Sequence, residues 1–251
     1  MDCRFVLGKP GAGREAYEQG HIPGAAFLDV DTDLAGEPGP RGRHPLPDAD
    51  RFEASARRAG IGRETCVVAY DESGEGGAAR LWWLLRHFGH GDVAVLDGGL
   101  KAWRDEGGAL TAGTEEVEEG DFAARPRAGD TVSAGDIAEA APRPGAAAGS
   151  RAAAGLRLLD ARAPERYRGE VEPIDPVAGH IPGATNVPFA EIAPDGRFLP
   201  SDELRERLGT DPFVAYCGSG VTACVLVLAG EVAGVEGRLY PGSWSEWCRR
   251  A

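Results

Sequence analysis

The sequence contains no apolar run approaching the roughly 18 residues that a membrane span needs, and its first residues lack the basic and apolar regions of a signal peptide. Basic residues are scarce: 27 Lys and Arg stand against 40 Asp and Glu, so the net charge is −13. Such a surface repels phosphate backbones and anionic membranes, which argues against nucleic-acid and membrane partners. The five cysteines are odd in number and include no Cys-x-x-Cys pair, so neither a disulfide framework nor a zinc site is expected. These absences predict a cytoplasmic protein with reduced thiols.

The chain repeats itself. Four landmarks recur in the same order, which indicates a duplicated domain. They are Asp2-Cys3-Arg4 with Asp160-Ala161-Arg162, Gly20-His21-Ile22-Pro23-Gly24-Ala25 with Gly179-His180-Ile181-Pro182-Gly183-Ala184, Val68-Ala69-Tyr70-Asp71 with Val214-Ala215-Tyr216-Cys217, and the segment 98–103 with 242–247. We therefore expect one domain at 1–127 and another at 128–251, with a longer insert in the first copy around 41–47.

Each copy alternates between short apolar strands and helices, which predicts an α/β fold with a parallel sheet flanked by helices. We expect strands at 66–70, 93–96, 156–159, 213–216 and 238–240, and helices at 81–85, 134–141 and 225–229. Residues 114–127 are typical of a linker, and 143–155 of a surface loop. The second copy has a helix and a strand before its Asp-x-Arg, whereas the first begins at Met1-Asp2. The first domain is therefore expected to lack its opening strand, either because the start is set too late or because the fold tolerates the gap.

The most informative stretch is the loop Cys217-Gly218-Ser219-Gly220-Val221-Thr222-Ala223, which lies between a predicted strand and a predicted helix. Its glycines allow a tight curl whose N–H groups point inward and bind an anion, and the helix N-terminus adds partial positive charge. A cysteine held there is favoured as the thiolate, the nucleophilic form. We therefore predict that Cys217 is a nucleophile, at the edge of the sheet where α/β folds bind ligands.

The first copy carries Asp71 at the position of Cys217. Its loop, Asp71-Glu72-Ser73-Gly74-Glu75-Gly76-Gly77, is acidic and has no thiol, so it is not expected to hold a substrate anion. This half of the chain is predicted to be catalytically inactive.

Together, the doubled Gly-His-Ile-Pro-Gly-Ala, the Asp-x-Arg pairs and the Cys-x-x-Gly-Val-Thr-Ala loop resemble the two-domain rhodanese sulfurtransferases over essentially the whole chain. The neutral loop is similar to that of the 3-mercaptopyruvate sulfurtransferases, since thiosulfate-preferring members show Cys-Arg-Lys-Gly there. The resemblance implies that Cys217 and Ser219 are catalytic. It also implies that Arg166 and the loop residues bind the donor; the loop residues are Gly218, Gly220, Val221, Thr222 and Ala223.

Two departures from the family concern charge and proton transfer. Animal members carry a second substrate arginine in Pro-Glu-Pro-Arg-Asp, whereas this chain has Ile174 near that position, so Arg162 or Arg168 is a candidate substitute. His21 is a further candidate functional residue. It is not preceded by the acidic residue of animal members, so a complete three-residue proton relay is not expected.

The resemblance implies a two-step reaction through a Cys217 persulfide, with 3-mercaptopyruvate or thiosulfate as donor and cyanide, a small thiol or thioredoxin as acceptor. No metal or organic cofactor is implied. Three alternatives remain: a thiosulfate-preferring enzyme, a non-catalytic rhodanese-like binding module and a phosphatase built on the same fold. The phosphatase needs an arginine six residues after the cysteine, where this chain has Ala223. The donor preference, the physiological acceptor and the oligomeric state are not fixed by the sequence.

Overall fold

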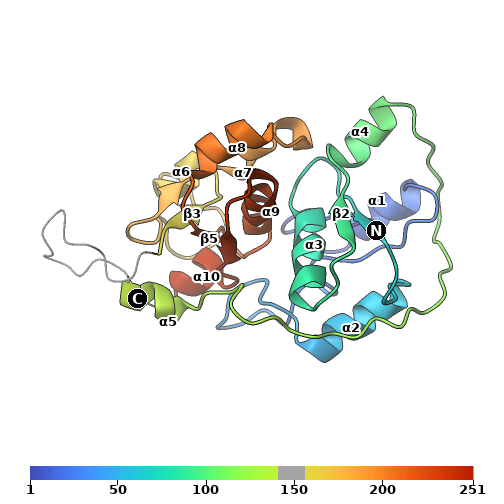
Figure 1. The fold of residues 1–251 in the computed structure, drawn as a ribbon, viewed down its shortest axis with the longest axis horizontal. Helices are drawn as coiled ribbons and strands as arrows, with labels where there is room; N and C mark the ends of the chain where they lie inside the picture. Colours follow the sequence, from blue (N-terminus) through green and yellow to red (C-terminus); the bar gives the residue numbers. More distant parts are fainter. Residues whose placement is uncertain (141–155, 251) are drawn as a thin grey trace, which may run out of the picture. The chain divides into compact units, whose positions relative to one another are not determined.

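The computed structural model describes residues 1–140 and 156–250, so the predicted surface loop at 143–155 lies outside the described residues. Two compact units are present (Figure 1). Unit 1 comprises Met1–Glu37, Leu46–Ala128 and Ala193–Phe198, and unit 2 comprises Pro38–Pro45, Gly129–Ile192 and Leu199–Ala251. None of the described helices is both long enough and apolar enough to cross a membrane.

Unit 2 contains a parallel sheet with the strand order β4-β3-β5-β6. The strands are β3 (Leu158–Asp160), β4 (Thr185–Asn186), β5 (Phe213–Tyr216) and β6 (Gly237–Leu239). The helices are α5 (Ala134–Ala140), α6 (Pro164–Tyr167), α7 (Phe189–Ile192), α8 (Ser201–Leu208), α9 (Ala223–Ala233) and α10 (Ser243–Trp247). The predicted α/β class, with a parallel sheet flanked by helices, is confirmed.

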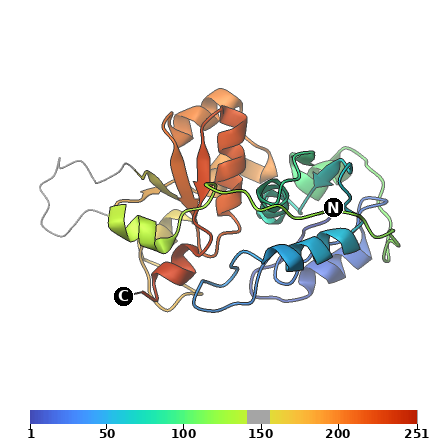
Figure 2. The same ribbon diagram turned by 60° about the horizontal axis from the view of Figure 1, so that its bottom comes forward.

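The central strand β5 is buried on both faces, as its apolar sequence predicts. Because side chains alternate along a strand, Val214 and Tyr216 share one face, where they join a buried cluster with Ile137 of α5 and Trp244 of α10. Phe213 faces α9, since a Cβ built on Gly230 would lie 3.0 Å from its ring. Figure 2 shows α9 beside the strands of unit 2. Packing on both faces thus fixes the end of β5, where Cys217 follows.

Unit 1 repeats this order with fewer strand residues. The parallel strands β1 (Val67–Ala69) and β2 (Val93–Val95) pair with each other, and Asp2 forms single parallel bridges with Phe27 and Tyr70. Across the sheet, the segments that contain Phe27, Asp2, β1 and β2 therefore lie in the same order as β4, β3, β5 and β6 of unit 2. The helices are α1 (Ala12–Gln19), α2 (Ala49–Arg58), α3 (Gly77–His87) and α4 (Gly99–Asp105), with the 3-10 helix η1 (Pro194–Gly196).

The opening strand differs between the units, as predicted. In unit 2, Thr131 forms a parallel bridge with Leu239 of β6, whereas among the described residues β2 pairs with β1 alone. The difference has a packing consequence. Val214 is fully buried at 0% exposure beneath the segment that includes Ile137, but its repeat counterpart Val68 is 45% exposed.

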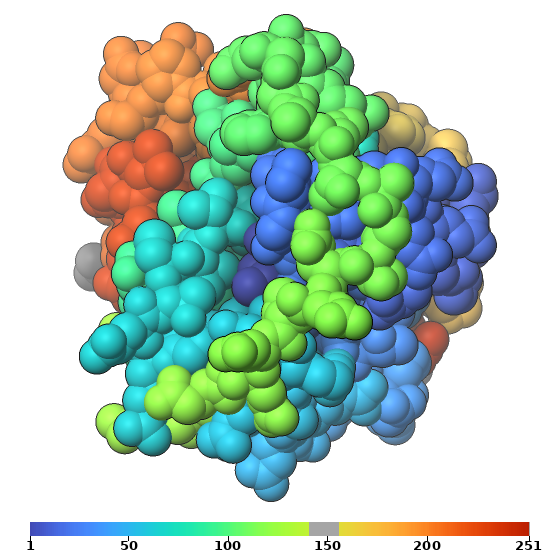
Figure 3. All heavy atoms as spheres, turned by 90° about the vertical axis from the view of Figure 1, so that its right-hand side faces the viewer, coloured from blue at the N-terminus to red at the C-terminus, as the bar shows by residue number. Residues whose placement is uncertain are grey.

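The predicted linker at 114–127 contains no helix or strand. Backbone hydrogen bonds attach it to unit 1: the N–H groups of Gly120, Phe122 and Arg125 donate to the carbonyls of Arg57, Ile61 and Phe88. Figure 3 shows this green segment extending across the surface of unit 1. The segment is therefore part of the packed surface of that unit.

Candidate active site

Cys217 lies directly after β5, at the carboxyl edge of the sheet, and is buried. The Gly220 N–H donates a hydrogen bond to its Sγ at 3.1 Å. Gly220 has φ 84°, and a Cβ built on it would lie 2.4 Å from the Pro241 carbonyl oxygen, so only glycine fits. The curl predicted for this loop is therefore present, and it directs an N–H group at the sulfur.

Helix α10 holds the loop from the other side. The N–H groups of Trp244 and Ser245 donate to the carbonyls of Cys217 and Gly218, both at 2.9 Å. The Ser243 hydroxyl accepts from the Cys217 N–H at 3.1 Å and donates to the Tyr240 carbonyl. The fourth repeated landmark thus has a structural explanation, because it supplies the donors that fix the cysteine loop.

The same framework in unit 1 surrounds Asp71. The Leu100 N–H donates to the Asp71 carbonyl, as Trp244 does to Cys217. The Asp71 carboxylate accepts from the N–H groups of Gly74 (2.7 Å), Gly76 (3.0 Å) and Ala78 (3.1 Å). Burial, with a smaller contribution from a neighbouring carboxylate, raises the pKa of Asp71 to about 6, although these donors oppose the shift. The loop of unit 1 therefore binds its own anion.

Arg166, on α6, reaches the cysteine loop. A Cβ built on Gly218 would lie 3.5 Å from Arg166 Nη1. The guanidinium is oriented by Glu172, whose Oε1 accepts from Arg166 Nη2 at 2.7 Å and whose side chain is 3% exposed. Burial alone would raise the pKa of Glu172, but hydrogen bonds from Arg166 and from the Asp175 N–H outweigh it and lower the pKa. The structure thus places the Arg166 guanidinium beside Gly218, the residue that follows Cys217.

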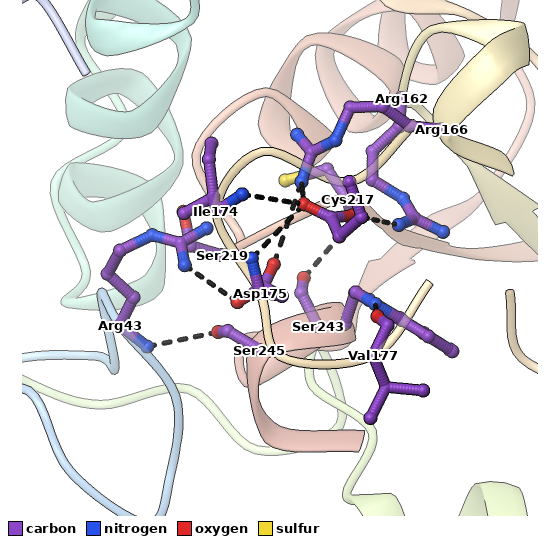
Figure 4. Close-up of polar contacts among 12 residues, drawn as sticks. Arg43, Arg162, Arg166, Ile174, Asp175, Val177, Cys217, Ser219, Ser243 and Ser245 are labelled. Atoms are coloured by element: carbon purple, nitrogen blue, oxygen red, sulfur yellow. Dashed lines mark hydrogen bonds and ion pairs between the residues drawn. The ribbon is translucent and has the colours of Figure 1, made fainter. Parts of the chain in front are cut away.

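Residues from the first half of the chain complete the neighbourhood. Pro38–Pro45 packs in unit 2, where the Arg43 N–H donates to Ser245 Oγ at 3.0 Å. A Cβ built on Gly218 would lie 3.3 Å from Arg43 Nη2. The buried ring of His44 lies with Nδ1 2.7 Å from Ser219 Oγ. Figure 4 shows Arg43, Arg166, Ser219 and Cys217 in this arrangement.

Arg162 has other partners. Its Nη2 contacts Asp160 Oδ2 and the Gly179 carbonyl, both at 2.7 Å, and its Nη1 lies 3.4 Å from Glu172 Oε2. Arg4 of unit 1 makes the equivalent bonds to Asp2 and Gly20. The same network occurs in unit 1, which has Asp71 in place of Cys217, so it serves the fold and Arg162 is part of that framework. Arg162 borders the site through Glu172 and through the Trp244 ring, whose centroid lies 5.0 Å from its guanidinium carbon.

His21 also belongs to a repeated framework contact. Its Nδ1 lies 2.9 Å from the Tyr17 carbonyl and its ring stacks on Tyr17 at 3.9 Å. His180 has the same relation to Tyr167, with distances of 2.8 and 4.0 Å. The histidine that contacts Ser219 is therefore His44, and His21 is bound within unit 1. Arg168, the other candidate arginine, forms an exposed pair with Glu170.

The remaining residues of the cysteine loop lead into α9. Val221 and Ala223 are buried, and Thr222 is the N-cap residue of α9. Sequence reasoning missed Arg43, His44, Glu172 and Asp175. The sequence offered one indication, the insert around 41–47 that distinguishes the first copy from the second. That residues 38–45 pack in unit 2 depends on tertiary contacts, which the sequence pattern does not show.

These features define a class: an α/β protein with two similar units and one cysteine held by a backbone N–H at a sheet edge. A profile of the rhodanese-like domain matches residues 1–106 and 146–250. The chain belongs to the rhodanese-like family.

Comparisons with individual proteins agree with this family. The chain is 46% identical to the "Probable 3-mercaptopyruvate sulfurtransferase" of Pseudomonas aeruginosa, with 98% of this chain and 88% of the relative covered. It is 44% identical to the "Putative thiosulfate sulfurtransferase SseB" of Mycobacterium tuberculosis, covering 98% and 86%. The crystal structure of SseA from Escherichia coli, a 3-mercaptopyruvate sulfotransferase, superposes with a TM-score of 0.82 at 34% identity, covering 98% and 92%.

Proposed function

We propose that this enzyme transfers sulfur from 3-mercaptopyruvate to a thiol acceptor through a persulfide on Cys217. The proposal is carried by the position of the Cys217 sulfur. This sulfur accepts a hydrogen bond from the Gly220 N–H, and the neighbouring Gly218 lies beside the guanidiniums of Arg43 and Arg166. A backbone donor aimed at sulfur favours the thiolate and the terminal sulfur anion of a persulfide alike.

The first half-reaction is a displacement at sulfur. The Cys217 thiolate attacks the donor sulfur, a sulfur–sulfur bond forms, and the carbon–sulfur bond breaks with its electron pair on the departing pyruvate carbon. The proton of the donor thiol ends on that carbon, which gives pyruvate and a Cys217 persulfide anion. In the second half-reaction an acceptor thiolate attacks the outer sulfur and releases the Cys217 thiolate.

Ser219 and His44 are proposed to carry the proton. Ser219 lies two residues after Cys217, and its Oγ is 2.7 Å from His44 Nδ1. A hydroxyl joined to an imidazole passes a proton without leaving a buried charge, because one group donates as the other accepts. Ser219 is therefore assigned to the transfer between the donor thiol and the pyruvate carbon, with His44 as its partner.

Unit 1 is proposed to be catalytically inactive. It has no thiol at the Asp71 position, and the Asp71 carboxylate already accepts from the N–H groups of Gly74 and Gly76 in the loop and of Ala78 in α3. The domains are assigned as 1–127 and 128–251. One active site per chain is proposed around Cys217 of the second domain, completed by residues 38–45, which pack in unit 2. The four loop residues Gly218, Val221, Thr222 and Ala223 form the donor-facing turn with Gly220.

The donor and acceptor are the finer part of the proposal. The neutral Gly-Ser loop favours 3-mercaptopyruvate, while the name of the Mycobacterium tuberculosis relative keeps thiosulfate as the second candidate. Thioredoxin or a small thiol is proposed as acceptor. A cytoplasmic location is proposed because all five cysteines are free thiols, which suits a reducing compartment.

The test compares pyruvate release from 3-mercaptopyruvate with sulfite release from thiosulfate, for the wild type and Cys217→Ser. We expect preferential pyruvate release and a loss of at least about 10³-fold in the variant, as for removal of a nucleophile. Mass spectrometry after donor treatment should show the mass of one added sulfur atom on Cys217. Full activity of Cys217→Ser would refute the persulfide, and the absence of both activities and of the adduct would favour a non-catalytic binding module.

A further inference from the structure

The segment 171–178 of unit 2 has its charged side chains buried and its apolar residues exposed. Its residues are Val171, Glu172, Pro173, Ile174, Asp175, Pro176, Val177 and Ala178. The two carboxylate side chains are 3% and 1% exposed. All six apolar residues are exposed, with Val171, Ile174 and Val177 at 49%, 41% and 47%. Folding ordinarily does the opposite, because burial stabilises apolar groups and penalises charges. The six apolar residues therefore form an outward surface, the 171–178 surface.

The inward carboxylates fix the orientation of this segment. Glu172 Oε1 accepts hydrogen bonds from Arg166 Nη2 at 2.7 Å and from the Asp175 N–H at 3.2 Å. Asp175 Oδ2 lies 3.6 Å from the same Arg166 nitrogen. The Val177 carbonyl accepts a hydrogen bond from Trp244 Nε1 at 2.8 Å. Turning the aliphatic side chains inward would break these contacts and leave buried charges without partners. The surface is therefore held in place before any partner binds.

The 171–178 surface lies beside the cysteine loop. Glu172 holds Arg166, whose Nη1 would lie 3.5 Å from a Cβ at Gly218, the residue after Cys217. Figure 4 shows Ile174 with Arg166 and Cys217. We therefore expect a protein that brings a thiol to Cys217 to cover part of this surface, and a small thiol to leave it exposed.

We propose that the 171–178 surface is a docking site for the sulfur acceptor, and that this acceptor is a protein whose reactive thiol is bordered by apolar side chains. The inference deepens the proposed function and rests on it. The chemical step is the second half-reaction. The acceptor thiolate bonds to the outer sulfur of the persulfide, the bond between that sulfur and Cys217 breaks, and its electron pair stays on the Cys217 thiolate. The product is a persulfide on the acceptor.

The composition of the surface favours this kind of partner. Aliphatic side chains and prolines gain free energy when apolar area is removed from water, so a partner with apolar groups is favoured over cyanide or a small polar thiol. A highly charged partner gains little, because both carboxylates of the segment point inward and are paired. A contact built on a few aliphatic side chains is small, which suits a transient partner that leaves after each sulfur transfer.

The experiment measures transfer from saturating 3-mercaptopyruvate to two acceptors: reduced thioredoxin as the protein thiol and dithiothreitol as the small thiol. The variants are Ile174→Ser and Val177→Ser, and the control is Val232→Ser, a 49% exposed valine of α9 in the same unit. We expect each variant to raise KM for thioredoxin about 5- to 20-fold with little change in kcat, as for an aliphatic side chain that is half buried on binding. KM for dithiothreitol and for 3-mercaptopyruvate should stay at the wild-type values, and Val232→Ser should match the wild type with both acceptors.

The outcomes separate this inference from the proposed function. If the wild type releases no pyruvate with either acceptor, the proposed function fails. If the wild type uses dithiothreitol but transfers sulfur no faster to thioredoxin at equal concentration, the docking site is overturned. It is also overturned if Ile174→Ser and Val177→Ser behave like Val232→Ser with thioredoxin. A parallel rise of KM for dithiothreitol would overturn it as well, because the substitutions would then act on the cysteine loop rather than on the bound protein.

Discussion

Glu172 orients the arginines of the candidate site, so its substitution has a calculable effect. It accepts from Arg166 at 2.7 Å, from the N–H groups of Ile174 and Asp175 at 3.2 Å, and lies 3.4 Å from Arg162. Glu172→Gln keeps the shape but removes the charge and turns an N–H group toward a guanidinium. Breaking a buried pair costs about 3–5 kcal/mol. Since the amide oxygen retains some bonds, we expect unfolding free energy to fall by about 2–4 kcal/mol.

The same change should weaken donor binding. With Arg166 no longer fixed, KM for 3-mercaptopyruvate should rise about 10- to 100-fold, which corresponds to losing one charge-assisted contact. The matched control is Glu170→Gln, two residues away, because Glu170 pairs with Arg168 at 2.7 Å while both side chains are more than half exposed. Such a surface pair contributes about 0–1 kcal/mol. Urea unfolding and pyruvate release measure the two effects, and equal behaviour of the two variants would refute the reasoning.

The effect of Glu172 also depends on pH, with a definite sign. Its pKa in the folded protein lies below the ordinary value, because hydrogen bonds from Arg166 and the Asp175 N–H outweigh the opposing effect of burial. A lowered folded-state pKa stabilises the protein above the unfolded-state pKa, and the contribution is lost as the pH falls through the folded-state value. The stability difference between the wild type and Glu172→Gln should therefore be full at neutral pH and shrink below about pH 4.3.

Two further predictions concern the Ser219–His44 pair and the burial of the central strand in each unit. His44→Gln and Ser219→Ala should each lower kcat for pyruvate release by about 10²-fold or more while leaving KM nearly unchanged, as expected for groups that move a proton; a change in KM alone, seen in steady-state kinetics, would contradict this role. Val214→Ala should lower unfolding free energy by about 2–3 kcal/mol, whereas its repeat counterpart Val68→Ala, which is 45% exposed, should cost under about 1 kcal/mol in the same urea titration. Equal losses of unfolding free energy in the two variants would contradict the difference in burial between Val214 and Val68.

Local patterns account for the parts of the structure that sequence reasoning predicted. The apolar run at 213–216 forms β5, because both of its faces are buried. The helix predicted at 134–141 is α5, and Ser133 and Asp136 cap its first turn, where the side chain of each accepts the other's N–H, at 2.9 and 3.2 Å. The curl at Gly220 follows from glycine chemistry within a few residues. Each of these features is decided by neighbours in the chain, so a short window of sequence contains the required information.

The missing parts of the site arise from contacts between distant segments. Arg43 meets Asp175 across 132 positions, and His44 meets Ser219 across 175. No periodicity or motif links such pairs. The presence of Ile174 where a second arginine was sought indicated that positive charge had to come from elsewhere, but nothing in the sequence indicated from which segment. Residues 38–45 of the first-copy insert pack in unit 2, and this places the Arg43 guanidinium beside Gly218.

Comparison of the two units separates the framework from the chemistry. Asp2 and Arg4 reproduce the bonds of Asp160 and Arg162, although unit 1 has no cysteine at the end of β1. A network that is retained without the nucleophile is required by the fold, so mutating it should affect stability in either unit. Cys217, Arg166 and the 38–45 segment have no such repeat, and they meet at one loop. Ser219 aligns with Ser73 of unit 1, but the Ser73 hydroxyl contacts Glu75, whereas that of Ser219 contacts His44. The duplicated sequence therefore provides an internal control: the residues that differ between the copies, rather than those that recur, are the ones to assign to sulfur transfer.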